Sequence, residues 1–153
     1  MGLMRRPANA LAGGVAGTAV LSLLLLFLDV ETREALGIFE AIARFAGMPG
    51  QIALGFVVFV AAGVVAWPLL FLAVEDYIPR EDPAAAGLLF GLVLWIPFAV
   101  VGRGDLSGPA LFVYLAFTLL AHLAYGFVLG AVTVHLADPT RDSVPSGGRR
   151  AGE

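Results

Sequence analysis

The sequence predicts an all-α integral membrane protein: a four-helix bundle with an extra amphipathic helix at the membrane interface, between the first and second spans. Of its 153 residues 59% are hydrophobic and 14% are charged, and the mean hydropathy is +0.92, far from the values of a soluble globular domain. Four apolar runs, residues 8–28, 51–74, 84–101 and 109–136, are each long enough to cross a hydrocarbon core of about 30 Å as a helix. Because most connections are short, we expect neighbouring helices to be antiparallel.

Residue usage excludes several classes of function. The chain has no cysteine, which excludes disulfides, thiolate metal sites and thiol chemistry. Its nine basic residues are all Arg and are outnumbered by twelve acidic residues. A high-GC genome explains the use of Arg over Lys, and the acidic excess with no Lys also fits a salt-adapted organism. No basic surface large enough for nucleic acid is expected.

Residues 8–28 form the first predicted span, after a short basic segment at residues 1–7. An Arg pair before an apolar run also resembles a secretory signal peptide. Here the run is too long, and the DVETRE that follows offers no small-residue cleavage site. Small residues recur at intervals of four, which allows helix backbones to approach closely in lipid. We therefore predict that Gly13 and Gly17 lie at a helix–helix contact of the G-x-x-x-G kind.

Residues 32–47 have the pattern of an amphipathic helix that is too short and too charged to span a membrane. Leu36 and Ile42 fall on one face, whereas Glu40 and Arg44 favour the other. We expect this helix either to lie in the interface plane or to cover the end of the bundle. A plain connecting helix is the alternative.

The two middle spans share a pattern of glycines on a repeat of four, followed by a tryptophan and a proline. The predicted helix contacts in these spans are Gly55, Gly63, Gly87 and Gly91. The predicted kinks are at Pro68 and Pro97. The shared pattern fits either a distant internal duplication or two similar packing surfaces. The acidic residues of the loop at 75–82 are expected to be solvated and not to bind a metal.

The last span, residues 109–136, carries both histidines of the chain. Reading it by fours places polar and small residues on one stripe, with Leu, Phe and Val opposite. The stripe consists of Tyr114, Thr118, His122, Gly126 and Gly130, with Tyr125 beside it. His122 falls near mid-span, where it is either a structural hydrogen-bonding group or a site for protons, a cofactor or a ligand. His135 lies about 20 Å further along the helix, so the two histidines cannot share one metal or haem within a chain.

Arginine counts predict the orientation in the membrane. The N-terminus, the loop at 75–82 and the C-terminal tail hold six Arg on one side, and the opposite side holds three. Because cytoplasmic segments carry the excess of basic residues, both termini are predicted to lie in the cytoplasm at the cell membrane. The tail, residues 137–153, is rich in Gly, Pro and Ser and is expected to be disordered.

Four segments, one in each span, carry a resemblance to a known family: GGVAGTAV, VVAWPLLF, LFGLVLWIPF and AHLAYGFVLG. Over residues 8–136 the chain resembles a family of small uncharacterised four-helix integral membrane proteins of halophilic archaea, a domain of unknown function. The stretch His122–Gly130 is the most specific part. The resemblance implies the fold, the membrane location and a salt-loving source, and it carries over no activity and no catalytic residue.

Three functions are compatible with this sequence. The first is a non-enzymatic structural or accessory subunit of a membrane complex, for example a respiratory one. The second is a homo-oligomeric channel or transporter for protons or a small solute, with His122, Thr118 and Tyr125 along its path. The third is haem or quinone binding through His122.

An enzyme is not expected, because the sequence has no nucleophile–base–acid set, no glycine-rich phosphate loop and no paired carboxylates within a span. In the first two cases we expect no cofactor and no metal. The expected partners are then the lipid bilayer and either further copies of the chain or the other subunits of a complex.

Overall fold

The computed structural model describes residues 5–78 and 82–137, which are helical with short connections and contain no strand. The helices are α1 (Arg5–Glu31), α2 (Ile38–Phe45), α3 (Ile52–Ala61), η1 (Ala62–Ala66), α4 (Trp67–Val74), η2 (Glu75–Tyr77), α5 (Pro83–Gly102) and α6 (Gly108–His135). In this part of the chain, four helical runs are long and apolar enough to cross a membrane: α1, the run Ile52–Tyr77, α5 and α6. They coincide with the predicted spans to within a few residues. Most of the N-terminal segment and the tail from residue 138 lie outside the described residues.

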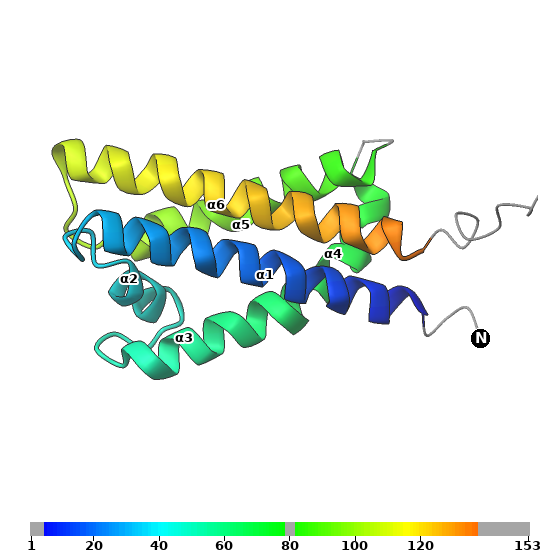
Figure 1. Cartoon of the computed structure of the whole chain (residues 1–153), viewed down its shortest axis with the longest axis horizontal. Coiled ribbons are helices and arrows are strands. Elements are labelled where there is room, and N and C mark those ends of the chain that lie inside the picture. Colours follow the sequence, from blue (N-terminus) through cyan, green and yellow to red (C-terminus); the bar gives the residue numbers. More distant parts are fainter. Residues whose placement is uncertain (1–4, 79–81, 138–153) are drawn as a thin grey trace, which may run out of the picture.

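Helices α1, α5 and α6 form the most closely packed part of the molecule, with α6 against both of the others. Both described ends of the chain lie at one end of the bundle (Figure 1). We call this the terminal end. At the opposite end α3 diverges from α1, and α2 fills the space between them (Figure 1). The four spans therefore do not make a regular four-helix bundle, because α3 packs chiefly on α2.

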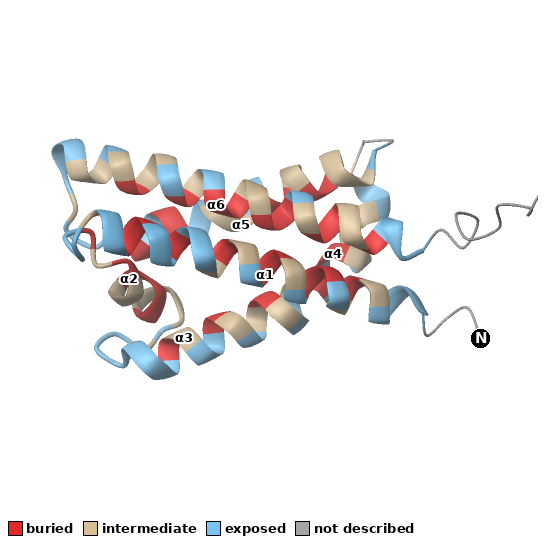
Figure 2. Cartoon of the chain, viewed as in Figure 1, coloured by how far each residue is buried: buried red, intermediate tan, exposed pale blue. Residues whose placement is uncertain are grey.

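The outward faces of the long helices are apolar. Residues exposed along α1, α3 and α6 alternate with a buried inner stripe (Figure 2). Leu23, Val100 and Phe112 are 66%, 66% and 73% exposed. A continuous apolar exterior of this kind is an aggregation hazard in water, but it is the surface that a bilayer requires.

The amphipathic helix is shorter than the predicted residues 32–47, because α2 comprises only Ile38–Phe45. The preceding segment turns instead, since Arg33 and Glu34 have φ angles of 50° and 61°, and left-handed backbone does not continue a helix. The Asp29 Oδ1 atom then accepts a hydrogen bond from the Ile38 N–H (3.2 Å), which satisfies the first donor of α2 from outside the helix.

Of the two predicted placements of this helix, the structure has the one at the end of the bundle. The apolar residues Ile38, Ala41, Ile42 and Ala43 are all fully buried. Helix α2 therefore packs as part of the core and does not lie flat on the outside.

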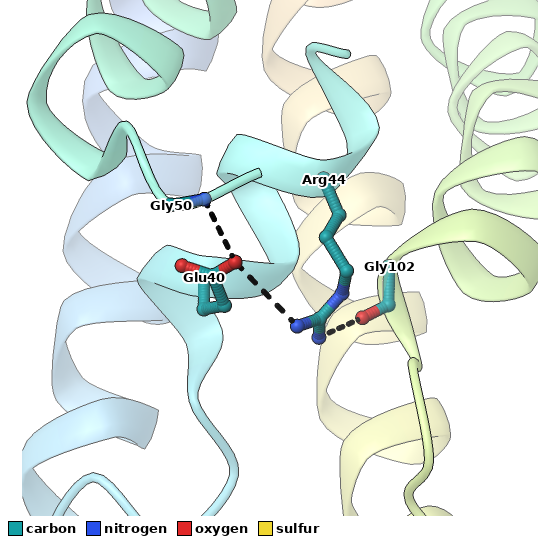
Figure 3. Close-up of polar contacts among 4 residues, drawn as sticks. All are labelled: Glu40, Arg44, Gly50 and Gly102. Carbon is teal, nitrogen blue, oxygen red and sulfur yellow. Dashed lines mark hydrogen bonds and ion pairs between the residues drawn. The ribbon is translucent and has the colours of Figure 1, made fainter. Parts of the chain in front are cut away.

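The polar edge of α2 ties three segments together (Figure 3). Arg44 Nη2 donates to the carbonyl oxygen of Gly102 (2.7 Å), the last residue of α5. Arg44 Nη1 also lies 3.9 Å from Glu40 Oε1, and that oxygen accepts a hydrogen bond from the Gly50 N–H (3.1 Å). A cation at a helix C-terminus satisfies its free carbonyls and is favoured by the helix dipole.

We expect Arg44→Ala to lower the free energy of unfolding by about 1.5–3 kcal/mol, because the charged hydrogen bond to Gly102 is lost. The exposed Arg103 provides the control, and Arg103→Ala is expected to change little. Thermal unfolding in mild detergent, followed by tryptophan fluorescence, compares the two. Equal midpoints would show that Arg44 does not hold the end of α5.

Candidate functional site

Five polar side chains of α6 are buried: Thr133 is 6% exposed, and Tyr114, Thr118, His122 and Tyr125 are each at most 4% exposed. The latter four belong to the stripe predicted from the sequence. Tyr114 OH donates to the Phe98 carbonyl oxygen of α5 (3.2 Å). Thr118 Oγ1 accepts from Trp95 Nε1 of α5 (3.1 Å) and donates to the Tyr114 carbonyl (2.7 Å). Tyr114 and Thr118 thus serve the contact between α5 and α6.

Tyr125 bonds to an irregular turn in the second span. The predicted kink at Pro68 takes the form of the π-helical turn η1, in which the Trp67 N–H bonds to the Ala62 carbonyl instead of the Gly63 carbonyl. The Gly63 carbonyl is left without its usual helical donor, and Tyr125 OH donates to it (2.8 Å). At the other predicted kink, α5 remains helical through Pro97.

The contact between α5 and α6 is made by backbone against backbone. A Cβ added at Gly87 would press on the Gly126 carbonyl oxygen, and one at Gly91 would press on the carbonyl oxygen of His122. Gly130 meets the Pro83 carbonyl in the same way. These glycines hold the backbone of α6 at His122 directly against α5.

The remaining predicted packing glycines contact three other elements. Gly13 and Gly17 lie against α6, where an added Cβ would be 2.8 Å from the Leu129 oxygen and 2.9 Å from the Tyr125 ring, respectively. An added Cβ at Gly63 would be 2.5 Å from Thr18 Oγ1 of α1. Gly55 contacts α2, because a Cβ added at Gly55 would lie 2.6 Å from the Cα atom of Ala43. The sequence spacing indicated that these residues make close contacts, but not which partner each one meets.

Among the polar residues of the stripe, His122 is the one that forms no hydrogen bond with another described helix. Its Nδ1 atom lies 2.7 Å from the carbonyl oxygen of Thr118 on the same helix. Because a carbonyl can only accept, Nδ1 carries the proton, and in the neutral imidazole Nε2 then has a free lone pair. The ring packs at 4.9 Å from the ring of Phe98, and no described residue forms a hydrogen bond with Nε2.

A small cavity of about 20 Å³ lies beside His122 and is called the histidine cavity below. It is lined by Leu21, Phe45, Phe59, Gly63, Trp67, Leu94, His122 and Tyr125. One water molecule needs about 10–15 Å³ of such volume, so the space fits a water-sized molecule and is far too small for a haem or a quinone. No charged side chain lines it among the described residues.

Several residues of this site were not predicted from the sequence. Phe45 and Phe59 reach the histidine cavity from α2 and α3, and Trp67 reaches it from the turn at Pro68. Thr18 Oγ1 is buried against Gly63 and lacks a hydrogen-bond partner among the described residues. The repeat of four residues that contains Trp67 indicated a buried face of the second span. Thr18 belongs to the repeat of small residues in the first span, which indicated a helix contact but not its partner. Nothing local marked Phe45, because its role depends on which helices meet.

The described residues contain no group of three or more His, Cys, Asp or Glu side chains placed to hold a metal ion. The acidic side chains near residue 75 lie at the terminal end, where Arg6 Nη2 is 3.2 Å from Glu75 Oε1. His135 lies at the end of α6, at the level of the chain ends.

No curated protein and no solved structure matches this chain. A family described as a family of unknown function, DUF6789, matches residues 4–144. That range includes all four apolar runs, α2 and the histidine cavity. The chain therefore belongs to the DUF6789 family, whose function is unknown.

Proposed function

We propose that this chain is a non-enzymatic, multi-pass protein of the cell membrane in which His122 binds a water-sized hydrogen-bond donor or a proton and passes it across the bilayer interior. The observation that carries the proposal is the free Nε2 atom of His122 beside the histidine cavity. His122 lies near the middle of α6, so this atom lies near mid-membrane.

The depth of His122 supports a function. Ionisable residues within a membrane are costly and usually functional, and the His122 side chain is 4% exposed. Tyr114, Thr118 and Tyr125 are all hydrogen-bonded to other helices in the structure, whereas His122 is not. A leucine at position 122 would fill similar space without an ionisable group.

The chemistry of the cavity selects the class of ligand. Nε2 can only accept a hydrogen bond while Nδ1 carries the proton. The Tyr125 hydroxyl donates its hydrogen bond to the Gly63 carbonyl, so the hydroxyl oxygen is left to accept a further hydrogen bond. Two acceptors and a volume of about 20 Å³ favour water, or a proton carried on water, as the occupant.

The orientation follows from the arginine distribution. The described chain ends lie at the same end of the bundle as the start of α5 (Figure 1). We place this end in the cytoplasm because the N-terminal segment, the loop at 75–82 and the tail together hold six of the nine Arg of the sequence. The acidic, Lys-free composition supports a salt-adapted source, with the halophilic archaea as the specific proposal.

Proteoliposomes test the function. Proton uptake is measured with an entrapped pH dye, and osmotic water flow by light scattering. We expect flux through the intact protein and, for His122→Leu, a fall to the level of protein-free liposomes. His135→Leu removes the other histidine and is expected to retain the flux. Unchanged flux in His122→Leu, or none above protein-free liposomes in the intact protein, would overturn the proposal.

The second candidate is an accessory subunit of a larger membrane complex. It is supported by the outer face of α3, where Ile52, Leu54 and Val57 are 47%, 48% and 62% exposed and no described helix covers them. Purification in mild detergent from the native membrane distinguishes the two candidates. Stoichiometric partner proteins would favour the accessory role, and a homogeneous species of this chain alone would count against it.

A further inference from the structure

A second cavity lies at the terminal end of the bundle and is called the terminal cavity below. It has a volume of about 240 Å³. Its polar wall is formed by Arg6 and Asn9 of α1, Glu75 after α4, and Thr133 of α6. Its wall toward the core includes Phe71 and Ala86. The terminal cavity therefore combines charged groups near the membrane surface with an apolar wall that faces the bundle interior.

The terminal cavity and the histidine cavity are both lined by residues from α1, α4, α5 and α6, at different levels along these helices, whereas α2 and α3 line only the histidine cavity. Along the second span, Trp67 lines the histidine cavity and Phe71, one turn later, lines the terminal cavity. In α6, Tyr125 lines the first and Thr133 the second, with Leu129 between them.

Helix α5 shows the same order, since Leu94 lines the histidine cavity, Ala86 lines the terminal cavity, and Phe90 lies between. On α5 and α6 the lining residues of the two cavities are thus about two turns apart, roughly 12 Å along each helix, with one buried side chain of each helix between them. The layer between the cavities consists of Phe71, Phe90 and Leu129, which are all at most 5% exposed. The rings of Phe71 and Phe90 are 5.3 Å apart.

The opposite side of the histidine cavity is lined by Phe45 of α2 and Phe59 of α3, and the ring of Phe98 lies 5.3 Å from the first and 6.0 Å from the second. The apolar face of α2 is fully buried, and its Arg44 is bonded to the end of α5 (Figure 3). Helix α2 therefore covers the cavity on this side.

We infer that the histidine cavity is reached from the terminal end of the bundle, with the terminal cavity as its vestibule and the Phe71–Phe90–Leu129 layer as its barrier. The inference rests on the proposed function, because it names the route by which a water-sized donor or a proton reaches His122. The barrier on this route consists of side chains alone, whereas the opposite route is covered by α2.

Single cysteines test the route, since the chain has none of its own. Thr133→Cys reports on the terminal cavity, His122→Cys on the histidine cavity, and Ser107→Cys on the exposed loop at the opposite end. Silver ion, which is close to water in size and does not cross lipid, is added to sealed inside-out or right-side-out vesicles. Thiols that remain free are then counted with a fluorescent maleimide after denaturation.

We expect the thiols of the Thr133→Cys and Ser107→Cys proteins to be blocked from opposite sides. The thiol of His122→Cys is expected to be blocked about tenfold or more faster from the side that blocks Thr133→Cys. Adding Phe90→Ala to His122→Cys should speed this reaction, and the matched control Phe59→Ala, which opens a ring on the other side, should not. Size-exclusion profiles check that each variant is folded.

Faster blocking of His122→Cys from the side that blocks Ser107→Cys would overturn the route, and so would acceleration by Phe59→Ala instead of Phe90→Ala. Failure of silver to reach the thiol at position 122 from either side, even with Phe90→Ala, would also overturn it. Flux through the cysteine-free protein is measured separately. If flux depends on His122 but the thiol at position 122 is blocked faster from the side that blocks Ser107→Cys, the route is rejected and the proposed function is retained. If His122→Leu leaves the flux unchanged, the proposed function itself is rejected.

Discussion

Gly126→Ala is expected to push α5 and α6 apart and to lower the free energy of unfolding by about 1–3 kcal/mol or more. An added Cβ at this position would press on the carbonyl oxygen of Gly87 and lie 2.9 Å from the Gly91 nitrogen. Both neighbours are backbone atoms of a helix, so neither can rotate away as a side chain can. The only relief is a shift of the helix itself, and every contact along the α5–α6 interface changes with it.

The control for this substitution is Ala19→Val, which adds more carbon than Gly126→Ala but at an exposed position of α1. We expect Ala19→Val to stay within about 0.5 kcal/mol of the parent, as is usual for a surface substitution. Thermal unfolding in detergent compares the two. A Gly126→Ala protein as stable as the Ala19→Val protein would show that the helices do not meet at these glycines.

His122→Leu is expected to leave the stability unchanged or to raise it by about 0.5–2 kcal/mol while flux is lost. The reason is that His122 forms no hydrogen bond to another helix, and the Thr118 carbonyl still receives the backbone N–H of residue 122 within α6. The substitution therefore replaces a polar side chain by an apolar one and leaves no new unpaired group behind.

Tyr125→Phe provides the matched comparison, because it removes a hydroxyl that does bond across helices. The Gly63 carbonyl would lose its donor, at a cost of about 1–3 kcal/mol. The two variants should thus move stability in different directions although the residues lie one turn apart in the same cavity. A His122→Leu protein destabilised as much as Tyr125→Phe would mean that His122 is structural.

The four spans could be predicted from the sequence because each is a long apolar run whose ends are marked by charged or helix-breaking residues. The boundaries of α2 could not, since they depend on the left-handed backbone at Arg33 and Glu34, which neither residue favours by itself. The covering position of α2 was one of two predicted placements, and it is decided by how far α3 diverges from α1.

The inner stripe of α6 could also be predicted, because a repeat of four residues places side chains on one helical face. The residues of other helices that this stripe contacts could not be predicted. Pro68 indicated an irregular turn, but not that the turn would leave the Gly63 carbonyl for Tyr125. The histidine cavity is formed by side chains from α1, α2, both halves of the second span, α5 and α6. Such a site exists only once the helices have packed.

The most direct test of the central claim is nitrogen NMR of the protein in lipid nanodiscs, with 15N-labelled histidine and His135→Gln so that the ring nitrogens of His122 alone are observed. We predict for His122 a proton on Nδ1, an unprotonated Nε2, and magnetisation transfer to Nε2 from a water molecule in the bilayer interior. A proton on Nε2 that is bonded to a protein carbonyl, with no transfer from water, would contradict the account and make His122 a packing residue.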